Sequence, residues 1–201
     1  MSVVIAIKDG DHVLVGCDSQ ATYGGYKTRL TVEHNKAWYI DDCPNGVMGS
    51  VGSLRALQLI QVTPNLIDEL AQYRNEVDFN YVVTELYWRL ADTLKHYCVI
   101  PSDMVPLLLP NDFIFAYKDK AWLIDADGAT MELVDYLCTG SGEEIARGIL
   151  ESTKDLPAMK RIEKAIRACS DLTTSVDNNV CIFSTAAEEE LIEDTDKPEE
   201  E

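Results

Sequence analysis

The chain begins with two strand patterns joined by a tight turn, and each strand is apolar on both faces. Residues 3–8 and 12–17 are typical of strands, and Asp9-Gly10 between them is a hairpin turn signal. Successive side chains of a strand point to opposite faces, so a sheet with one wet face would alternate apolar and polar residues. This hairpin lacks that alternation, because Val4 and Ala6 are as apolar as Ile5 and Ile7. We therefore expect its sheet to be covered on both sides.

The rest of the chain alternates between blocks of strands and pairs of helices. Further strands are predicted at 37–40, 46–50, 112–117, 121–125, 130–134 and 179–183. Helices are predicted at 53–62, 80–96, from Glu143 onward, and at 159–169. No element is predicted for the polar stretch around Gly24-Gly25, and residues 98–110, with three prolines, are predicted to be a loop. This order predicts an α+β fold, a four-layer αββα sandwich of two stacked antiparallel sheets between helix pairs.

Two local patterns refine this outline. Within residues 80–96, an apolar stripe at helical spacing predicts a surface that faces the core, formed by Val83, Leu86, Tyr87, Leu90 and Leu94. Before the first helix, Gly49 and Gly52 are expected to bracket a strand-to-helix turn.

The charge distribution separates a folded domain from a tail. The formal net charge is −18, which disfavours nucleic acid and anionic membranes as partners. Residues 187–201 hold nine acidic residues against one lysine, a composition that predicts a disordered tail after a single domain at 1–186. No run approaches the roughly 18 apolar residues of a membrane span, and the N-terminus does not resemble a signal peptide. We therefore expect a cytoplasmic protein.

The cysteines and histidines do not form a metal-binding pattern. The six cysteines include no CxxC pair, and the three histidines are scattered. Several cysteines lie within apolar runs, where a thiol behaves as a small hydrophobic group, so we expect the cysteines to be reduced core residues. We expect neither a metal nor another cofactor.

Two stretches near the N-terminus, together with the element order, resemble the proteasome β subunit and the bacterial HslV-type protease, which are N-terminal nucleophile hydrolases. The stretches are Ser2-Val-Val-Ile-Ala-Ile and Val-Leu-Val-Gly-Cys-Asp18-Ser-Gln-Ala-Thr22. That family begins with a nucleophile, a β-hairpin, and an Asp sixteen residues after the nucleophile; Asp18 stands sixteen residues after Ser2. The resemblance extends to about Phe183.

The resemblance implies that Ser2 is the nucleophile once Met1 has been removed. A serine hydroxyl needs a base to take its proton. A free α-amine, with an unperturbed pKa of about 7.7–8.0, can act as that base near neutral pH. Retention of Met1 would convert the amine into an amide and abolish the arrangement. A Met before a small residue such as Ser is normally excised.

Further residues match the positions that support the nucleophile in this family. Lys36 matches a lysine on the third strand, which Asp18 would hold and whose charge would lower the pKa of the amine and of the hydroxyl. Gly49 is our choice for the oxyanion donor before the first helix, with Gly52 as the competitor. Taken singly, Asp18 is more typical of a turn residue and Lys36 of a surface lysine, and only their joint placement with Ser2 favours the functional interpretation. The two glycines are also compatible with ordinary turn glycines.

The C-terminal part of the resemblance is less sharply defined. Ser141, in a Gly-Ser-Gly loop, matches a serine that hydrogen-bonds near the terminal amine. The family also has an Asp and a Ser near the last helix, for which Asp171, Ser175 and Asp177 are all candidates because the spacing differs.

The resemblance implies a peptidase that hydrolyses polypeptides within a homo-oligomeric ring fed by a ring-shaped ATPase unfoldase. The usual nucleophile is Thr, and this chain has Ser. Two alternatives therefore stay open: a catalytically inactive ring or scaffold subunit, and an amidase of the same fold that acts on a small substrate.

Overall fold

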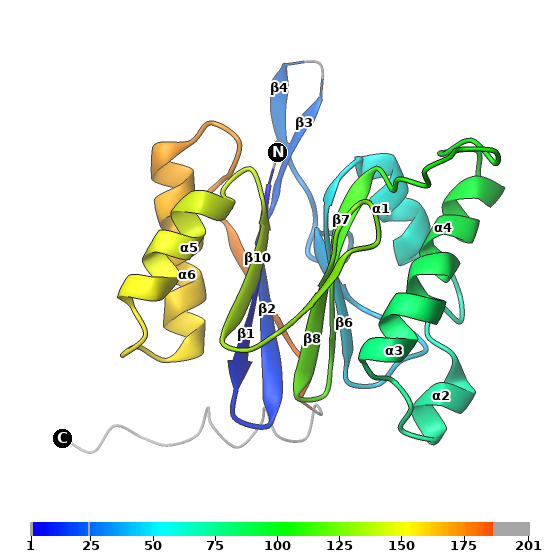
Figure 1. Ribbon diagram of the computed structural model, residues 1–201. Helices are drawn as coiled ribbons and strands as arrows, with labels where there is room; N and C mark the ends of the chain where they lie inside the picture. The colour runs from blue at the N-terminus through cyan, green and yellow to red at the C-terminus, as the bar shows by residue number, and fades with distance from the viewer. Residues whose placement is uncertain (1, 24, 187–201) are drawn as a thin grey trace.

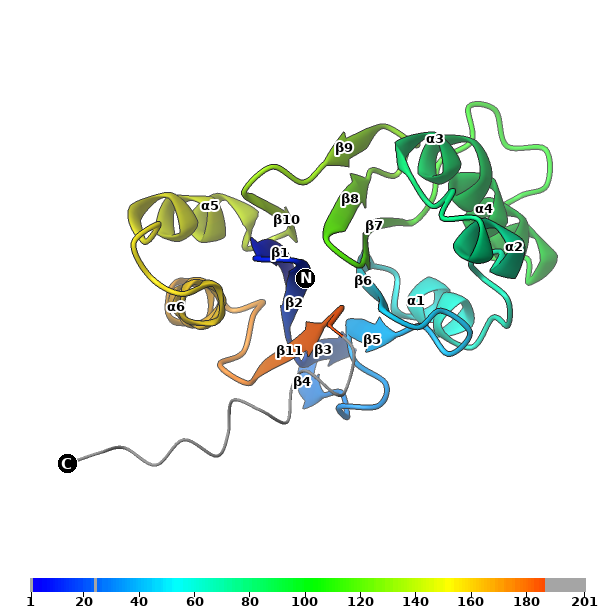
Figure 2. The same ribbon diagram turned by 90° about the horizontal axis from the view of Figure 1, so that it is seen from below.

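Two β-sheets stack face to face between two layers of helices. The computed structural model describes residues 2–23 and 25–186. Figure 1 shows the sheets in the middle of the molecule with α5 and α6 on one side and α1 to α4 on the other, and Figure 2 shows the same layers from below. The four-layer αββα sandwich predicted from the sequence is confirmed. The acidic tail at 187–201 lies outside the described residues.

The first sheet has four antiparallel strands in the order β10-β1-β2-β11. Its strands are β1 (Val3–Asp9), β2 (His12–Asp18), β10 (Tyr136–Gly140) and β11 (Val180–Ser184). The predicted hairpin is β1–β2, with Gly10 at φ +65° in its turn. Because β1 lies between β10 and β2, its first residues are held on both sides.

The second sheet has five antiparallel strands in the order β5-β6-β7-β8-β9. They are β5 (Ala37–Tyr39), β6 (Gly46–Gly52), β7 (Asn111–Tyr117), β8 (Lys120–Ile124) and β9 (Thr130–Glu132). A separate two-stranded hairpin, β3 (Gln20–Tyr23) and β4 (Tyr26–Arg29), projects from one end of the sandwich (Figure 1). It occupies the polar stretch for which no element was predicted.

Three apolar layers fill the spaces between the four structural layers. Small side chains such as Val4 and Ala6 pack between the two sheets. Val3, Ile5 and Ile7 point the other way, toward α5 (Glu143–Ser152) and α6 (Ala158–Leu172). A third cluster joins the second sheet to the helices α1 (Leu54–Gln61), α2 (Glu69–Tyr73), α3 (Phe79–Tyr81) and α4 (Tyr87–His96). The two apolar faces of the N-terminal hairpin are thus both covered, as predicted.

The apolar stripe predicted within residues 80–96 is correct except at its start. Leu86, Leu90 and Leu94 are fully buried, but Val83 is 36% exposed and Val82 is buried in its place. A π-helical turn, η1 (Val82–Leu86), joins α3 to α4. Such a turn has a wider hydrogen-bond spacing than an α-helix, so the buried face moves by one residue.

The six cysteines, all of them among the described residues, are free thiols. Four are buried, Cys181 is half-buried and Cys98 is exposed, so the expected core position is wrong for Cys98. Burial raises the pKa of Cys43 and of Cys138 to about 12, so both thiols stay protonated at neutral pH. Across the described part of the chain, no helix combines the length and the apolar character needed to cross a membrane.

Candidate active site

The sequence-predicted residues converge at one end of the sandwich because several strands begin or end there. Ser2 directly precedes β1, while Asp18 closes β2 and Gly140 closes β10. Neighbouring antiparallel strands run in opposite directions, so the start of β1 lies beside the ends of β2 and β10. In the facing sheet, Lys36 directly precedes β5 and Gly52 closes β6.

A buried ion pair joins Asp18 and Lys36 across the two sheets. Asp18 is fully buried, Lys36 is 4% exposed, and Oδ1 lies 2.7 Å from Nζ. The same Oδ1 accepts the Val3 N–H at 3.0 Å, and Oδ2 accepts the N–H groups of Gln20 at 3.1 Å and Asp177 at 3.3 Å. A buried ion pair is tolerated when further hydrogen bonds satisfy its charges, and Asp18 has four donors. These bonds fix the Lys36 ammonium in position.

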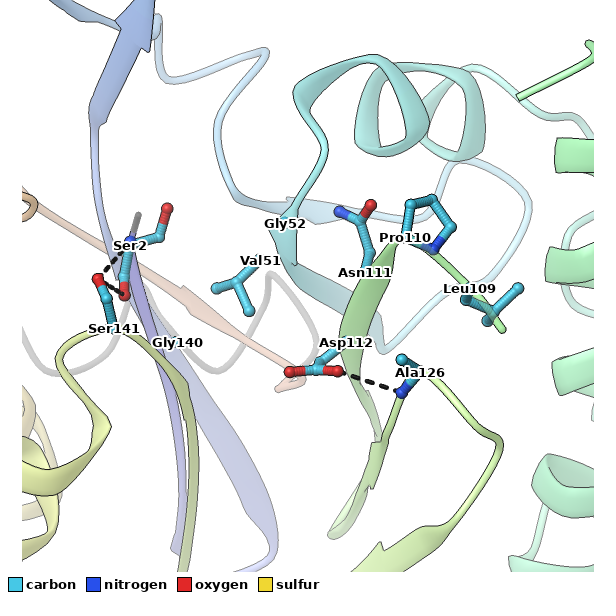
Figure 3. A pocket seen from close by; sticks show the side chains of 10 residues that line it. All are labelled: Ser2, Val51, Gly52, Leu109, Pro110, Asn111, Asp112, Ala126, Gly140 and Ser141. Carbon is cyan, nitrogen blue, oxygen red and sulfur yellow. Dashed lines mark hydrogen bonds between the residues drawn. The ribbon is translucent and has the colours of Figure 1, made fainter. Parts of the chain in front are cut away.

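Three serines form a chain of short contacts around the start of β1. The Ser2 nitrogen lies 3.1 Å from Ser141 Oγ, which lies 3.0 Å from Ser175 Oγ (Figure 3 draws the Ser2–Ser141 contact). Ser2 itself is 7% exposed. Gly140, with φ +108°, lets the loop approach closely, since a Cβ there would lie 2.3 Å from the Ser2 carbonyl oxygen. The nitrogen of Ser2 is therefore held against a hydroxyl group.

Gly49 does not lie in the strand-to-helix turn, so its expected placement is wrong. It lies inside β6 opposite Ile114, and a Cβ there would come within 2.6 Å of Val4 Cγ1 in the facing sheet. Gly49 therefore serves the close packing of the two sheets. Gly52 is the glycine at the turn, with φ +127° and a missing Cβ only 2.4 Å from the Pro110 carbonyl oxygen. The error arose because β6 runs two residues further than predicted.

Of the three candidates near the last helix, the structure brings Ser175 and Asp177 to the site and leaves Asp171 out. Asp171 is exposed in the last turn of α6. The Asp177 carboxylate accepts hydrogen bonds from the N–H and hydroxyl of Ser19 and from Arg29 Nε, while its own N–H reaches Asp18. Asp177 thus ties the final loop to the Asp18–Lys36 pair.

Asn111 braces the turn that carries Gly52, and the sequence did not single it out. Asn111 is 2% exposed; its Oδ1 accepts the Ser53 N–H at 3.0 Å. Its Nδ2 donates to Ser50 Oγ at 2.9 Å and to the Ser53 carbonyl at 3.2 Å. These three bonds span the turn on both sides of Gly52. No sequence motif marks an asparagine at the start of a strand for such a role.

Two cavities lie on either side of the end of β6, and Ser2, Val51 and Gly52 line both. The first, the β7-side cavity, has a volume of about 370 Å³ and is also lined by Asp112 and by Ser141 (Figure 3). The second, the β5-side cavity, has a volume of about 140 Å³ and includes Gln20, Lys36 and Leu57 in its wall. A chain crossing Ser2 can therefore place a side chain on each side of it.

Comparisons with known proteins identify the family of this chain. The family model for the proteasome subunit matches residues 2–183. A proteasome subunit beta from Ferroglobus placidus is 29% identical over 171 residues, which cover 83% of this chain and 75% of that protein.

Two solved structures share the fold. HslV from Trypanosoma brucei has a TM-score of 0.67 at 19% identity and covers 90% of this chain and 98% of its own. Thiobacillus denitrificans BPH in complex with epoxomicin has a TM-score of 0.68 at 17% identity, covering 90% and 97%. The family match spans nearly all described residues, and we conclude that this chain belongs to the proteasome subunit family and is of the β/HslV type.

Proposed function

We propose that the protein is a peptidase subunit whose nucleophile is the Ser2 hydroxyl, freed by removal of Met1. The observation that carries this proposal is the position of Ser2 at the start of β1. There its nitrogen lies 3.1 Å from Ser141 Oγ, and it shares the β5-side cavity with Lys36. A nucleophile and a base on one residue need a positioned nitrogen and a nearby fixed cation. The contact of the Ser2 nitrogen with Ser141 and the fixed Lys36 ammonium support this proposal.

In the proposed reaction, the α-amine of Ser2 takes the proton from Oγ as Oγ attacks the peptide carbonyl carbon. The N–H of Gly52, in place of Gly49, donates to the resulting oxyanion. The protonated amine then gives its proton to the leaving nitrogen as the C–N bond breaks, which leaves an ester on Ser2. Water hydrolyses this ester by the same route.

Lys36 assists by its charge, because a nearby cation disfavours protonation of the amine. An unperturbed α-amine titrates at about 7.7–8.0. We therefore expect turnover to rise with pH, with a midpoint at or below this range, and then to level off.

Family membership supports a cytoplasmic homo-oligomeric ring that encloses the Ser2 sites. In such a ring, a ring-shaped ATPase unfoldase would deliver polypeptide substrates. Native mass spectrometry of the purified protein measures the assembly, and a monomer at micromolar concentration would contradict this part of the proposal.

The experiment measures the rate at which wild-type protein and three single-residue variants hydrolyse a fluorogenic peptide. Ser2→Ala removes the hydroxyl and abolishes turnover, whereas Ser2→Thr keeps both hydroxyl and amine and retains it. Ser152→Ala, on the exposed face of α5, is the matched control and keeps the wild-type rate. Cleavage by Ser2→Ala would refute the nucleophile. An inactive wild type with a free Ser2 terminus would favour the non-catalytic ring subunit.

A further inference from the structure

Among the described residues of its wall, the β7-side cavity has one charged side chain. Of the described residues that line it, Asp112 is the one with an ionisable side chain, and the others include Val51, Leu109 and Pro110. Figure 3 shows the Asp112 carboxylate pointing from β7 across the cavity toward Gly140. An entering side chain thus meets apolar walls and one carboxylate.

The Asp112 carboxylate is fixed in place and keeps capacity for a ligand. Its Oδ1 accepts the Ala126 N–H at 3.2 Å, and its Oδ2 accepts the Thr139 hydroxyl at 2.9 Å. An ionised carboxylate has about four acceptor positions, so each oxygen can accept one more hydrogen bond. A side chain that is already oriented loses little entropy when a ligand binds.

A second carboxylate, that of Asp125, lies near Asp112. Burial, followed by the negative charge of Asp112, raises the pKa of Asp125. Lys36 lines the other cavity and is already paired with Asp18. A cation that enters the β7-side cavity therefore meets an acidic side chain and, among the described lining residues, no basic one.

The proposed chemistry places the leaving group of the substrate on this side. The base that takes the proton from Oγ must deliver it to the leaving nitrogen, so that nitrogen lies near the Ser2 amine. The Ser2 nitrogen contacts Ser141, and Ser141 lines the β7-side cavity but is not among the residues that line the β5-side cavity. The residue after the scissile bond thus faces Asp112.

We propose that Asp112 selects substrates with Lys or Arg immediately after the scissile bond, an inference that rests on the proposed function. The apolar walls contact the methylene stem of such a side chain, and its charged head donates to the free acceptor positions of Asp112. Asp112 is then a specificity-determining residue of the leaving-group side.

The test compares two peptides that differ at one position, Arg or its uncharged analogue citrulline, directly after the scissile bond. We expect wild-type kcat/KM to be about tenfold or more higher for the Arg peptide, in line with hydrogen bonds to charged groups. Asp112→Asn keeps the size of the side chain and brings the ratio toward one. Asp92→Asn removes an exposed carboxylate on α4, outside the cavity wall, and keeps the wild-type ratio. Equal rates in wild type, or a ratio unchanged in Asp112→Asn, would overturn the inference.

A binding measurement separates this inference from the proposed function. If processed wild-type protein cleaves neither peptide, the proposed function fails, and the fluorescence anisotropy of both labelled peptides on Ser2→Ala protein decides the inference alone. Tighter binding of the Arg peptide that depends on Asp112 supports a cation site; equal binding rejects it. The Arg–citrulline comparison needs no change at Asp112, so poor folding of Asp112→Asn leaves it decisive.

Discussion

Gly140 provides the sharpest test of how the fold positions Ser2. An ideal Cβ on Gly140 would lie 2.3 Å from the Ser2 carbonyl oxygen, whereas ordinary van der Waals contact begins at 3.4 Å. Gly140→Ala must therefore move the Ser2 backbone or the end of β10 by about 1 Å, and a displacement of this size can cost about 100-fold in rate. That factor corresponds to about 2.7 kcal/mol of transition-state stabilisation. The φ of +108° adds backbone strain of about 1–3 kcal/mol to the folded state.

The assay is kcat for a fluorogenic peptide, measured beside thermal unfolding. Gly148→Ala is the control, because Gly148 lies in α5 and a Cβ there has no neighbouring atom within 4 Å. The control keeps the wild-type kcat and gains up to about 1 kcal/mol in stability, because Ala has the higher helix propensity. Gly140→Ala protein that remains folded and turns over within threefold of wild type would refute the reasoning.

Three further predictions follow from single contacts. Asn111→Ala removes the three hydrogen bonds that brace the turn at Gly52. We expect steady-state kinetics to show at least a tenfold lower kcat, and denaturant unfolding to show a free energy of unfolding that is about 1–3 kcal/mol lower. An unchanged kcat would contradict the bracing role. Gly49→Ala places a methyl group 2.6 Å from Val4 in the facing sheet and lowers stability by about 1–3 kcal/mol. Gly52→Ala instead lowers kcat by roughly 100–1000-fold, because Gly52 is the proposed oxyanion donor. Unfolding and turnover are measured on both variants; a large loss of kcat in Gly49→Ala but not in Gly52→Ala would identify Gly49 as the donor. The Arg161 hydrogen bond lowers the pKa of Asp135 below 3.8, so this carboxylate stabilises the fold above that pH and loses its effect as the pH falls through the lowered value. The difference in Tm between wild type and Asp135→Asn is therefore present at about pH 6 and shrinks in acid, and a difference that grows in acid would contradict the assignment.

The layered fold was predictable because its strongest signals are local. The N-terminal hairpin needs cover on both faces, and that requirement is visible in a dozen residues. Strand β10 (Tyr136–Gly140) was missed because it belongs to the sheet through pairing with β1, about 130 residues away along the chain. The hairpin β3–β4 was missed because its described side chains are largely solvent-exposed and lack apolar alternation.

The candidate site was predictable where a motif marks the residue. Ser2, Asp18, Lys36 and Ser141 were named from motifs, and the structure brings all four together. The choice of Gly49 was wrong in placement because composition does not determine where β6 ends.

Other site residues were beyond the reach of sequence reasoning. Asn111 and Asp112 were not named, because they reach the site through the pairing of β7 with β6. The shifted stripe at Val82 has a similar origin, since a π-helical turn has no clear sequence signature.

The central claim is that Ser2 is a free N-terminal nucleophile, and one mass measurement tests it directly. Purified wild-type protein is analysed intact before and after treatment with an electrophile directed at N-terminal Ser or Thr, and the adduct is mapped by peptide analysis. We expect a starting mass without Met1 and one adduct per chain on the peptide that begins at Ser2. Retained Met1, or an adduct that persists in Ser2→Ala, would contradict the account.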